Sequence, residues 1–269
     1  MGGGVHAARS SHQRAPRSWV GLGVVAGLFA TVVLAAGAGA VGPLPESAVR
    51  FGDARDTGTR LPASSPLLTE TLREFTTMTA TRYQHHNQES TATGTYFYDC
   101  VGFVTYALGR SVPQARTTIM TRFSIRPGYV PSPARYVQFF NELGGHQSGW
   151  TPVHRVADLH PGDVVAWTYD HPTNSNGHAF VVAAPPRQDK SESWLVSVWD
   201  STATPHGPSD TRRSNPKNLP GPNGKPSGLG RGTVRLDTNT DGTLTNVHWS
   251  PNRGTVPSAR FGIGRPTGS

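Results

Sequence analysis

The chain has 269 residues, of which 35% are hydrophobic and 16% charged, and it contains 31 glycines and 23 prolines. This composition is too apolar for a fully disordered chain and predicts a modest core with long loops. The formal net charge is +8, but the arginines are scattered and no basic stripe carries interleaved aromatic residues, so we expect no nucleic-acid partner.

The amino-terminal region predicts export from the cytoplasm. Residues 1–18 carry Arg9, Arg14 and Arg17 and no acidic residue, and residues 19–42 form an uncharged apolar run. That run is long enough to span a bilayer, and the basic flank should stay in the cytoplasm, so the rest of the chain should be extracytoplasmic. The "AGA" at 38–40 resembles a signal-peptidase site. The pattern leaves open a cleaved signal peptide, which gives a secreted domain, or a retained membrane anchor.

The exported part divides into a linker and one domain. Residues 43–65 are rich in Pro, Gly and Ser and predict a linker, and residues 66–269 form the domain. Since only three positive charges precede residue 43, the exported part has a net charge of about +5. Such a charge favours residence near anionic wall or membrane surfaces.

Three helices are predicted in the first half of the domain. The first runs for about 15 residues from Pro66, with apolar residues at helical spacing. The second begins at Asp99 or Cys100 and ends near Gly109. The third lies within 131–145, with Ser132 as its N-cap and a glycine as its stop.

The second half of the domain predicts strands. Short apolar segments rich in valine occupy 162–169, 177–184 and 194–200, and Pro, Gly and Asn separate them. Residues 232–250 predict two strands around an Asp-Gly turn, and "ARFGIG" predicts a last strand. Helices followed by an antiparallel sheet indicate an α+β domain.

Cys100 is the single cysteine of the chain, so no internal disulfide can form. In the predicted second helix it occupies the first turn, where peptide dipoles and free N–H groups lower the pKa of a thiol. The residue is therefore placed to be a nucleophile, although a lone cysteine on an apolar helix face is also typical of simple packing.

A thiol nucleophile needs a base, and the base needs an orienting group. His178 begins one predicted strand and Asp200 ends the next. If those strands are adjacent and antiparallel, Asp200 lies beside His178 and can hold the tautomer that accepts the thiol proton. Taken alone, His178 is more typical of a surface or hydrogen-bonded histidine, and Asp200 is more typical of a turn.

Three ordered motifs resemble the NlpC-like papain-fold peptidases of bacterial cell walls. "YDCVGFV" at 98–104 is similar to the family's D-C-S-G signature, with Val101 in place of Ser. "LHPGDVV" at 159–165 and "GHAFV" at 177–181 are similar to the two motifs that follow it. The resemblance covers roughly residues 80–205 and implies a papain-like domain with helices packed on an antiparallel sheet.

The resemblance also implies roles for individual residues. Cys100 would be the nucleophile, His178 the base and Asp200 the orienting residue, while Asp163 would be structural. For the oxyanion or substrate-binding role we select Tyr83 by its position, and Tyr96 and Tyr98 are the next candidates. The implied activity is a cysteine peptidase or amidase that cleaves an amide bond in peptidoglycan or another cell-envelope polymer. No metal or organic cofactor is implied.

Two further patterns could bind ions. Asp237, Asn239 and Asp241 have the spacing of a calcium loop, but His248 stands where the closing Glu belongs, so we expect a hairpin. The histidines His85, His86 and His206 lack partners at ligand spacing, and we expect them in surface loops or at the substrate.

Two alternatives to a peptidase remain open at the level of sequence. The first is a catalytically silent, wall-associated binding or scaffold domain. The second is an acyltransferase or lipid hydrolase with the same machinery. The sequence makes no prediction of the oligomeric state.

Overall fold

The computed structural model describes residues 65–146, 149–169, 177–256 and 259–268. The predicted cytoplasmic segment 1–18, the apolar run 19–42 and all but the last residue of the linker lie outside these residues. Within the described part of the chain, no helix is both long and apolar enough to cross a membrane.

The helices gather in the first half of the domain, as predicted. In chain order they are α1 (Pro66–Thr77), α2 (Cys100–Ser111), α3 (Pro113–Arg122) and α4 (Pro133–Asn141), followed by the short 3-10 turns η1 (Val156–Asp158) and η2 (Thr211–Arg213).

Local chemistry explains where these helices start. Pro66 opens α1, and α4 begins with Pro133 after the predicted cap Ser132, whose Oγ accepts the Arg135 N–H. The prediction missed α3, in which only Ala115 and Ile119 are buried.

The strands follow mainly after residue 150. They are β1 (Ala80–Arg82), β2 (Gln88–Ser90), β3 (Thr95–Phe97), β4 (Trp150–Pro152), β5 (Val164–Tyr169), β6 (His178–Val182), β7 (Arg187–Lys190), β8 (Ser193–Thr202), β9 (Gly228–Thr238), β10 (Leu244–Ser250), β11 (Arg253–Thr255) and β12 (Ala259–Pro266).

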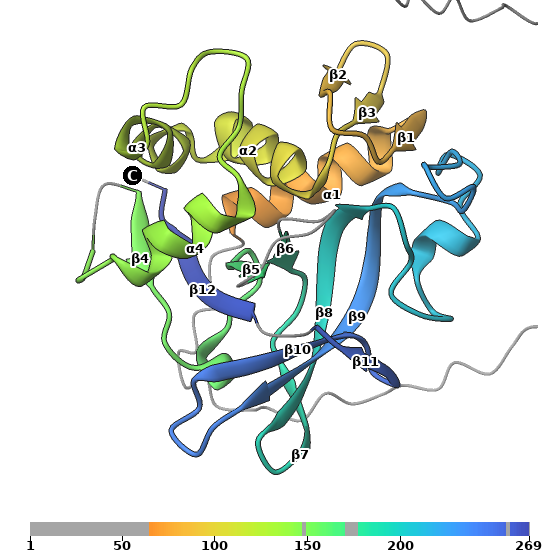
Figure 1. The fold of residues 1–269 in the computed structure, drawn as a ribbon. Coiled ribbons are helices and arrows are strands. Elements are labelled where there is room, and N and C mark those ends of the chain that lie inside the picture. Colours follow the sequence, from red (N-terminus) through yellow and green to blue (C-terminus); the bar gives the residue numbers. More distant parts are fainter. Residues whose placement is uncertain (1–64, 147–148, 170–176, 257–258, 269) are drawn as a thin grey trace, which may run out of the picture. The chain divides into compact units, whose positions relative to one another are not determined.

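Most strands belong to one antiparallel sheet. In the described residues it has nine strands in the order β11-β10-β9-β8-β6-β5-β12-β4, with β7 paired to β8. β1, β3 and β2 form a separate small sheet. The four helices lie together on one side of the large sheet, where α2 contacts β6 and β8 and α4 contacts β5 and β12 (Figure 1). The α+β class predicted from the sequence is confirmed.

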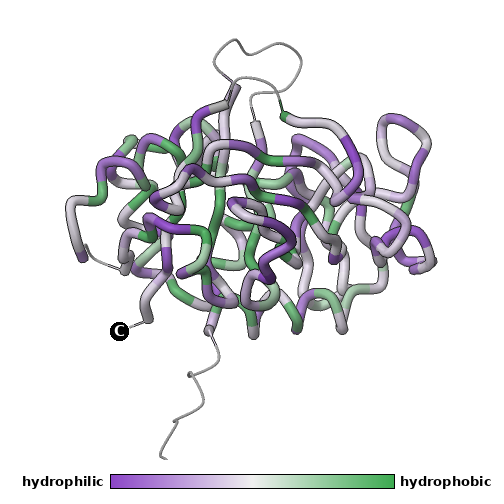
Figure 2. Tube along the Cα trace, turned by 90° about the horizontal axis from the view of Figure 1, so that it is seen from below, coloured by the Kyte–Doolittle hydropathy of each residue, from purple (hydrophilic) through white to green (hydrophobic). Residues whose placement is uncertain are grey.

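The central strands are buried on both faces because two cores sandwich them. Val164, Ala166 and Val181 pack against the helices. Phe180 and Val182, with other alternate residues, pack in a second core on the opposite side of the sheet. Burial on both faces explains why these segments are continuously apolar in sequence. In Figure 2 the apolar residues recur along the central part of the trace, and the projecting loops are mostly hydrophilic.

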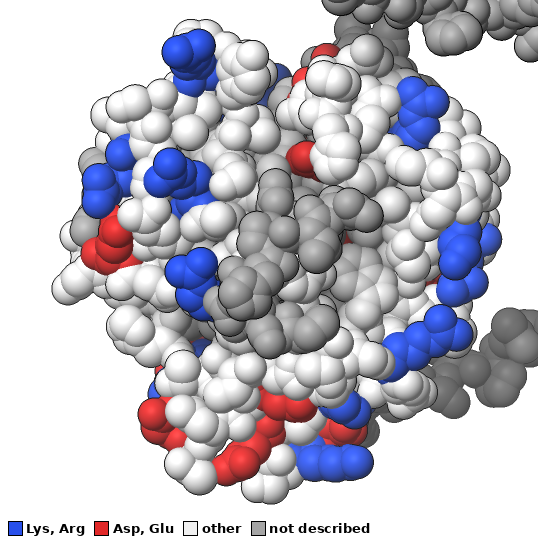
Figure 3. Space-filling view, viewed as in Figure 1, with Lys and Arg blue, Asp and Glu red and all other residues white. Residues whose placement is uncertain are grey.

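The segment with calcium-loop spacing forms the β9–β10 hairpin, as expected. The N–H of Thr243 donates to the side chains of Asn239 and Asp241, and the Asp237 carboxylate accepts from Ser193 Oγ and His248 Nε2. Acidic side chains gather around the ends of β7 and of this hairpin, with basic side chains directly beside them, and further basic groups are spread over the face drawn in Figure 3.

Candidate functional site

A cleft of about 920 Å³ lies where the start of α2 meets the start of β6. It is lined by Tyr83, His85, Asp99, Cys100, Val101, Val130, Pro131, Ser132, Pro133, Trp167, Tyr169, Gly177, His178, Thr202, Ala203, Thr204, Pro222 and Trp249. Two of the three predicted catalytic residues, Cys100 and His178, thus share one cleft although 78 positions separate them.

The start of α2 fixes the position of Cys100. Asp99 is the N-cap, and its Oδ1 accepts the N–H of Gly102 at 2.8 Å. Gly102 lies so close to Asn87 that a Cβ atom would come within 2.5 Å of Asn87 Oδ1. The glycine of the "DCVG" motif therefore has a packing reason, because it lets the segment before β2 lie against the first turn of the helix.

The thiol is buried, with 4% of Cys100 exposed, and it accepts hydrogen bonds from the N–H groups of Ala179 and Val101. Burial raises the pKa of Cys100, the Asp99 carboxylate raises it further, and the two N–H groups oppose this only in part. The sequence-based expectation of a lowered pKa is therefore wrong for this structure, because desolvation outweighs the helix terminus. The resting thiol is neutral.

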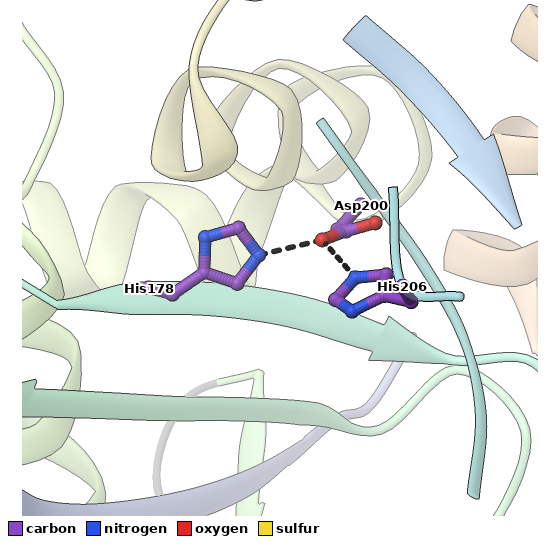
Figure 4. Close-up of side chains that lie close together, drawn as sticks. All are labelled: His178, Asp200 and His206. Atoms are coloured by element: carbon purple, nitrogen blue, oxygen red, sulfur yellow. Dashed lines mark hydrogen bonds and ion pairs between the residues drawn. The ribbon is translucent and has the colours of Figure 1, made fainter. Parts of the chain in front are cut away.

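His178 and Asp200 come together as the strand pattern predicted. β6 and β8 pair antiparallel, with Val181 opposite Trp199, and His178 Nε2 lies 2.6 Å from Asp200 Oδ2 (Figure 4). Nδ1 lies on the side of the ring that faces away from Asp200. Among the described residues Nδ1 has no hydrogen-bond partner, and no hydrogen bond joins the ring to Cys100 Sγ.

Aromatic rings hold the imidazole of His178 in place. The ring of Trp167 lies 5.0 Å from it and that of Trp249 lies 5.1 Å from it, measured between centroids. Gly177 precedes the histidine with φ of 123°, and a Cβ there would collide with the Trp167 carbonyl. The glycine of the "GH" motif thus makes the tight approach to β5 possible.

Asp200 is fully buried and has more partners than the sequence indicated. His206 Nε2 lies 2.8 Å from the Asp200 Oδ2 that also contacts His178 (Figure 4), and the Arg212 guanidinium contacts Oδ1. Arg212 is itself fully buried, and it also donates to Asp210 Oδ2 at 2.7 Å. From the sequence we expected His206 in a surface loop or at the substrate, and no pattern indicated a role for Arg212.

These partners determine the ionisation of the site. Burial raises the pKa of Asp200, but Arg212, His206 and the hydrogen bonds from both imidazoles outweigh it and hold that pKa well below its usual range. Burial lowers the pKa of His178, against the opposing effect of Asp200. The resting pair is a carboxylate with a neutral imidazole. Since Nε2 must donate to the carboxylate, the Nδ1 lone pair is left available to accept a proton.

Glycines on one face of β9 make room for these buried partners. A Cβ at Gly230 would lie 2.5 Å from Arg212 Cγ, and one at Gly232 would lie 2.6 Å from His206 Cβ. The "GLGRG" segment at 228–232 was the sequence signal that something bulky packs against this strand.

The three candidate tyrosines separate in the structure. Tyr83 lines the cleft, and burial together with the acidic groups around it raises its pKa, so it is a neutral phenol and a potential donor. Tyr96 and Tyr98 are fully buried, and Tyr98 Oη donates to Glu74 Oε2 at 2.7 Å. Tyr96 and Tyr98, the second choices for the oxyanion or substrate-binding role, do not line the cleft, because their hydroxyls contact Arg73 and Glu74 of α1.

The remaining histidines occupy different environments. His85 lines the cleft, and its Nδ1 lies 3.1 Å from Asp99 Oδ2. His86 is exposed, as expected. His206 is buried, and its placement in a surface loop is corrected because the loop after β8 folds back onto β9 and β10.

His178, Asp200 and His206 place three potential metal ligands within 4.8 Å of one another. Both imidazoles lie at hydrogen-bond distance from one carboxylate oxygen, and Arg212 contacts the other oxygen. A divalent cation would add two positive charges beside a buried guanidinium, so this donor set fits a hydrogen-bonded cluster better than a metal centre.

Comparison with known proteins identifies a viral relative. The chain is 30% identical over 194 residues to Uncharacterized protein R653 of Acanthamoeba polyphaga mimivirus, and the match covers 63% of this chain and 79% of the viral protein. The chain therefore belongs to the same family as this mimiviral protein. No family model matches the chain, and no solved structure matches it.

Proposed function

We propose that this protein is an exported cysteine hydrolase of the NlpC-like, papain-fold kind that cleaves an amide bond in peptidoglycan peptides. The observation that carries the proposal is the cleft shared by Cys100 and His178, with Asp200 hydrogen-bonded to the imidazole. The nucleophile at a helix start, the base at a strand start and the acid on the neighbouring strand follow the order of the family's motifs.

The first half of the proposed reaction forms a thioester. Because the resting thiol and imidazole are both neutral, Sγ of Cys100 attacks the amide carbonyl carbon while its proton passes to Nδ1 of His178. Asp200 stabilises the imidazolium that forms. Backbone N–H groups at the start of α2 and the phenol of Tyr83 stabilise the oxyanion. The imidazolium then protonates the leaving amine as the C–N bond breaks.

The second half of the reaction restores the enzyme. Water attacks the thioester carbon and gives a proton to Nδ1 of His178, and the C–S bond breaks. The sulfur takes the proton back, and the product leaves as a carboxylic acid. No metal or organic cofactor takes part.

The substrate class is inferred from location. The basic flank and apolar run of residues 1–42 predict a domain outside the membrane, and the positive charge of the exported part suits an anionic envelope polymer. Residues 19–42 serve as a membrane anchor unless they are cleaved.

A second candidate function is a catalytically silent wall-associated domain. The buried thiol of Cys100 and the missing hydrogen bond to His178 favour it, because a silent domain needs only the packing of the cysteine. The two candidates differ in whether Cys100 reacts in the folded protein.

Digestion of purified peptidoglycan sacculi tests the proposal. We expect the full chain to release peptide fragments with new amino and carboxyl ends, identified by mass, and Cys100→Ala to release none. The control variant for Cys100→Ala is Gly254→Ala, because Gly254 lies on the exposed strand β11. Ala179→Val would be a poor control because Ala179 contacts the thiol. Sacculi left intact by the wild type would reject the peptidoglycan hydrolase, and failure of Cys100 to react with iodoacetamide before unfolding would favour the silent domain.

A further inference from the structure

Asp200 is surrounded by more charged groups than it needs in order to orient one histidine. Asp200, Asp210, Arg212 and His206 are all at most 3% exposed. Asp210 Oδ2 accepts the backbone N–H of His206 at 2.8 Å and a guanidinium hydrogen of Arg212. Two carboxylates and one guanidinium carry a net charge of −1, and an uncompensated buried charge is strongly unfavourable.

The hydrogen bonds of His206 show where the missing charge lies. Its Nδ1 faces the carbonyl oxygen of Trp249 at 2.8 Å, and a carbonyl can only accept. Its Nε2 faces Asp200 Oδ2 at 2.8 Å, and this carboxylate is ionised. A neutral imidazole has one N–H and would point a lone pair at one of these oxygens. Only the doubly protonated ring satisfies both.

We propose that His206 is held as an imidazolium and, with Arg212, clamps the Asp200 carboxylate so that His178 keeps its proton on Nε2. His206 is a positioning residue, since it reaches the cleft chemistry only through Asp200. This catalytic consequence rests on the proposed function, but the protonation states of the two histidines do not.

Arg212 and His206 contact different oxygens of Asp200 and have different roles. Arg212 is fixed by Asp200 Oδ1, Asp210 and the carbonyl oxygens of Gly228 and Gly230, so it sets the position of the carboxylate group. His206 and His178 share Oδ2. The shared oxygen moderates the attraction of Asp200 for the His178 proton, which keeps His178 neutral until it accepts the thiol proton.

Nitrogen NMR of the full chain labelled with 15N-histidine reports these states directly. At neutral pH we expect both ring nitrogens of His206 to be protonated, and we expect His178 to have a protonated Nε2 and an unprotonated Nδ1. Assignments come from His206→Gln and His178→Gln. An unprotonated ring nitrogen on His206 of the wild-type protein would overturn the proposal.

The His206→Gln variant then tests the effect on the reaction. A loss of the buried cation should shift His178 toward a mixture of tautomers and slow fragment release from sacculi on the order of 100-fold, with the half-saturating concentration of sacculi unchanged. His248→Gln is the matched control. His248 is also buried and lies 2.5 Å from Asp237, but its side chain is on the face of β10 opposite Trp249.

The outcomes separate this inference from the proposed function. If the expected His206 and His178 signals appear while wild-type protein releases nothing from sacculi, the clamp stands and the peptidoglycan hydrolase fails. If His206→Gln folds, keeps the Nε2 proton on His178 and releases fragments at the wild-type rate, the positioning role is refuted.

Discussion

Two fully buried carboxylates lie in different parts of the domain and have opposite properties. Asp200 on β8 contacts Arg212, His206 and His178, and its pKa lies well below the usual range. Glu74 on α1 accepts only from Tyr98 Oη, and its Oε1 has no hydrogen-bond partner among the described residues. Burial raises the pKa of Glu74 to about 8.

The difference shows that burial alone does not determine the charge of a carboxylate. Both groups lose their hydration, but only Asp200 gains cations and donors that replace it. The arginines near Glu74 are engaged elsewhere, because Arg73 and Arg110 both contact Glu70. The cleft thus keeps a permanent charge beside its histidine, whereas the helical layer holds a carboxyl group that is protonated over most of the physiological range.

Removal of the charge on Asp200 should have the largest effect. In Asp200→Asn the cations Arg212 and His206 lose their shared partner, which should lower the free energy of unfolding by about 3 to 5 kcal/mol. Turnover should fall on the order of 10⁴-fold, because the amide also permits the wrong His178 tautomer. Fragment release and chemical denaturation measure the two effects. Asp163→Asn, which breaks the ion pair of this buried carboxylate with the partly exposed Arg265 near β5, should cost stability and leave turnover intact. Unchanged turnover in Asp200→Asn would contradict the orienting role.

Glu74 should behave in the opposite way. Since the folded state keeps its proton up to a pH of about 8 and the unfolded chain loses it near 4.5, the free energy of unfolding should fall as pH rises between these values. Glu74→Gln should abolish this decline and be more stable than wild type at pH 8 by on the order of 3 to 4 kcal/mol. Denaturation at several pH values is the measurement. The exposed Glu142→Gln should follow the wild-type profile, and a Glu74→Gln profile parallel to wild type would show that Glu74 is ionised throughout.

The glycine face of β9 offers a way to disturb the Asp200 cluster without altering charge. Gly230→Ala brings a methyl group against Arg212 Cγ, and this overpacking should cost about 1 to 3 kcal/mol. Thermal denaturation of Gly230→Ala is compared with Gly254→Ala, where a Cβ meets no atom within 4 Å. Equal stabilities of the two variants would mean that the Arg212 side chain can move aside.

The smallest expected effect is a change in the pH dependence of Cys100 alkylation. Burial and Asp99 raise the pKa of this thiol, so the rate of alkylation by iodoacetamide should have its inflection above the free value of about 8.5. Asp99→Asn should lower the inflection by about one pH unit or less, because it removes one neighbouring negative charge. An inflection below 8.5 in wild type would instead indicate a preformed thiolate, and the neutral starting state of the proposed reaction would be wrong.

Local patterns predicted many of the elements around the site. The helix start at Cys100, the caps of α4 and the strands β5, β6 and β8 follow from apolar periodicity and turn residues, which act over a few positions. Antiparallel pairing of β6 with β8 then brought His178 and Asp200 together. α3 escaped prediction because two buried residues four positions apart give too weak a pattern.

The sequence by itself therefore determined the α+β class, the order of Cys100, His178 and Asp200, and the place of the last two at a strand start and a strand end. Only the tertiary structure decided which groups surround them. The loop after β8 folds back and brings His206 and Arg212 into contact with Asp200, and the packing of α2 against β6 buries Cys100. These contacts join segments that are distant in the chain, and a local periodic pattern does not predict which distant segments meet. Desolvation and buried charge, which set the protonation of the thiol, the imidazoles and the carboxylate, depend on such packing.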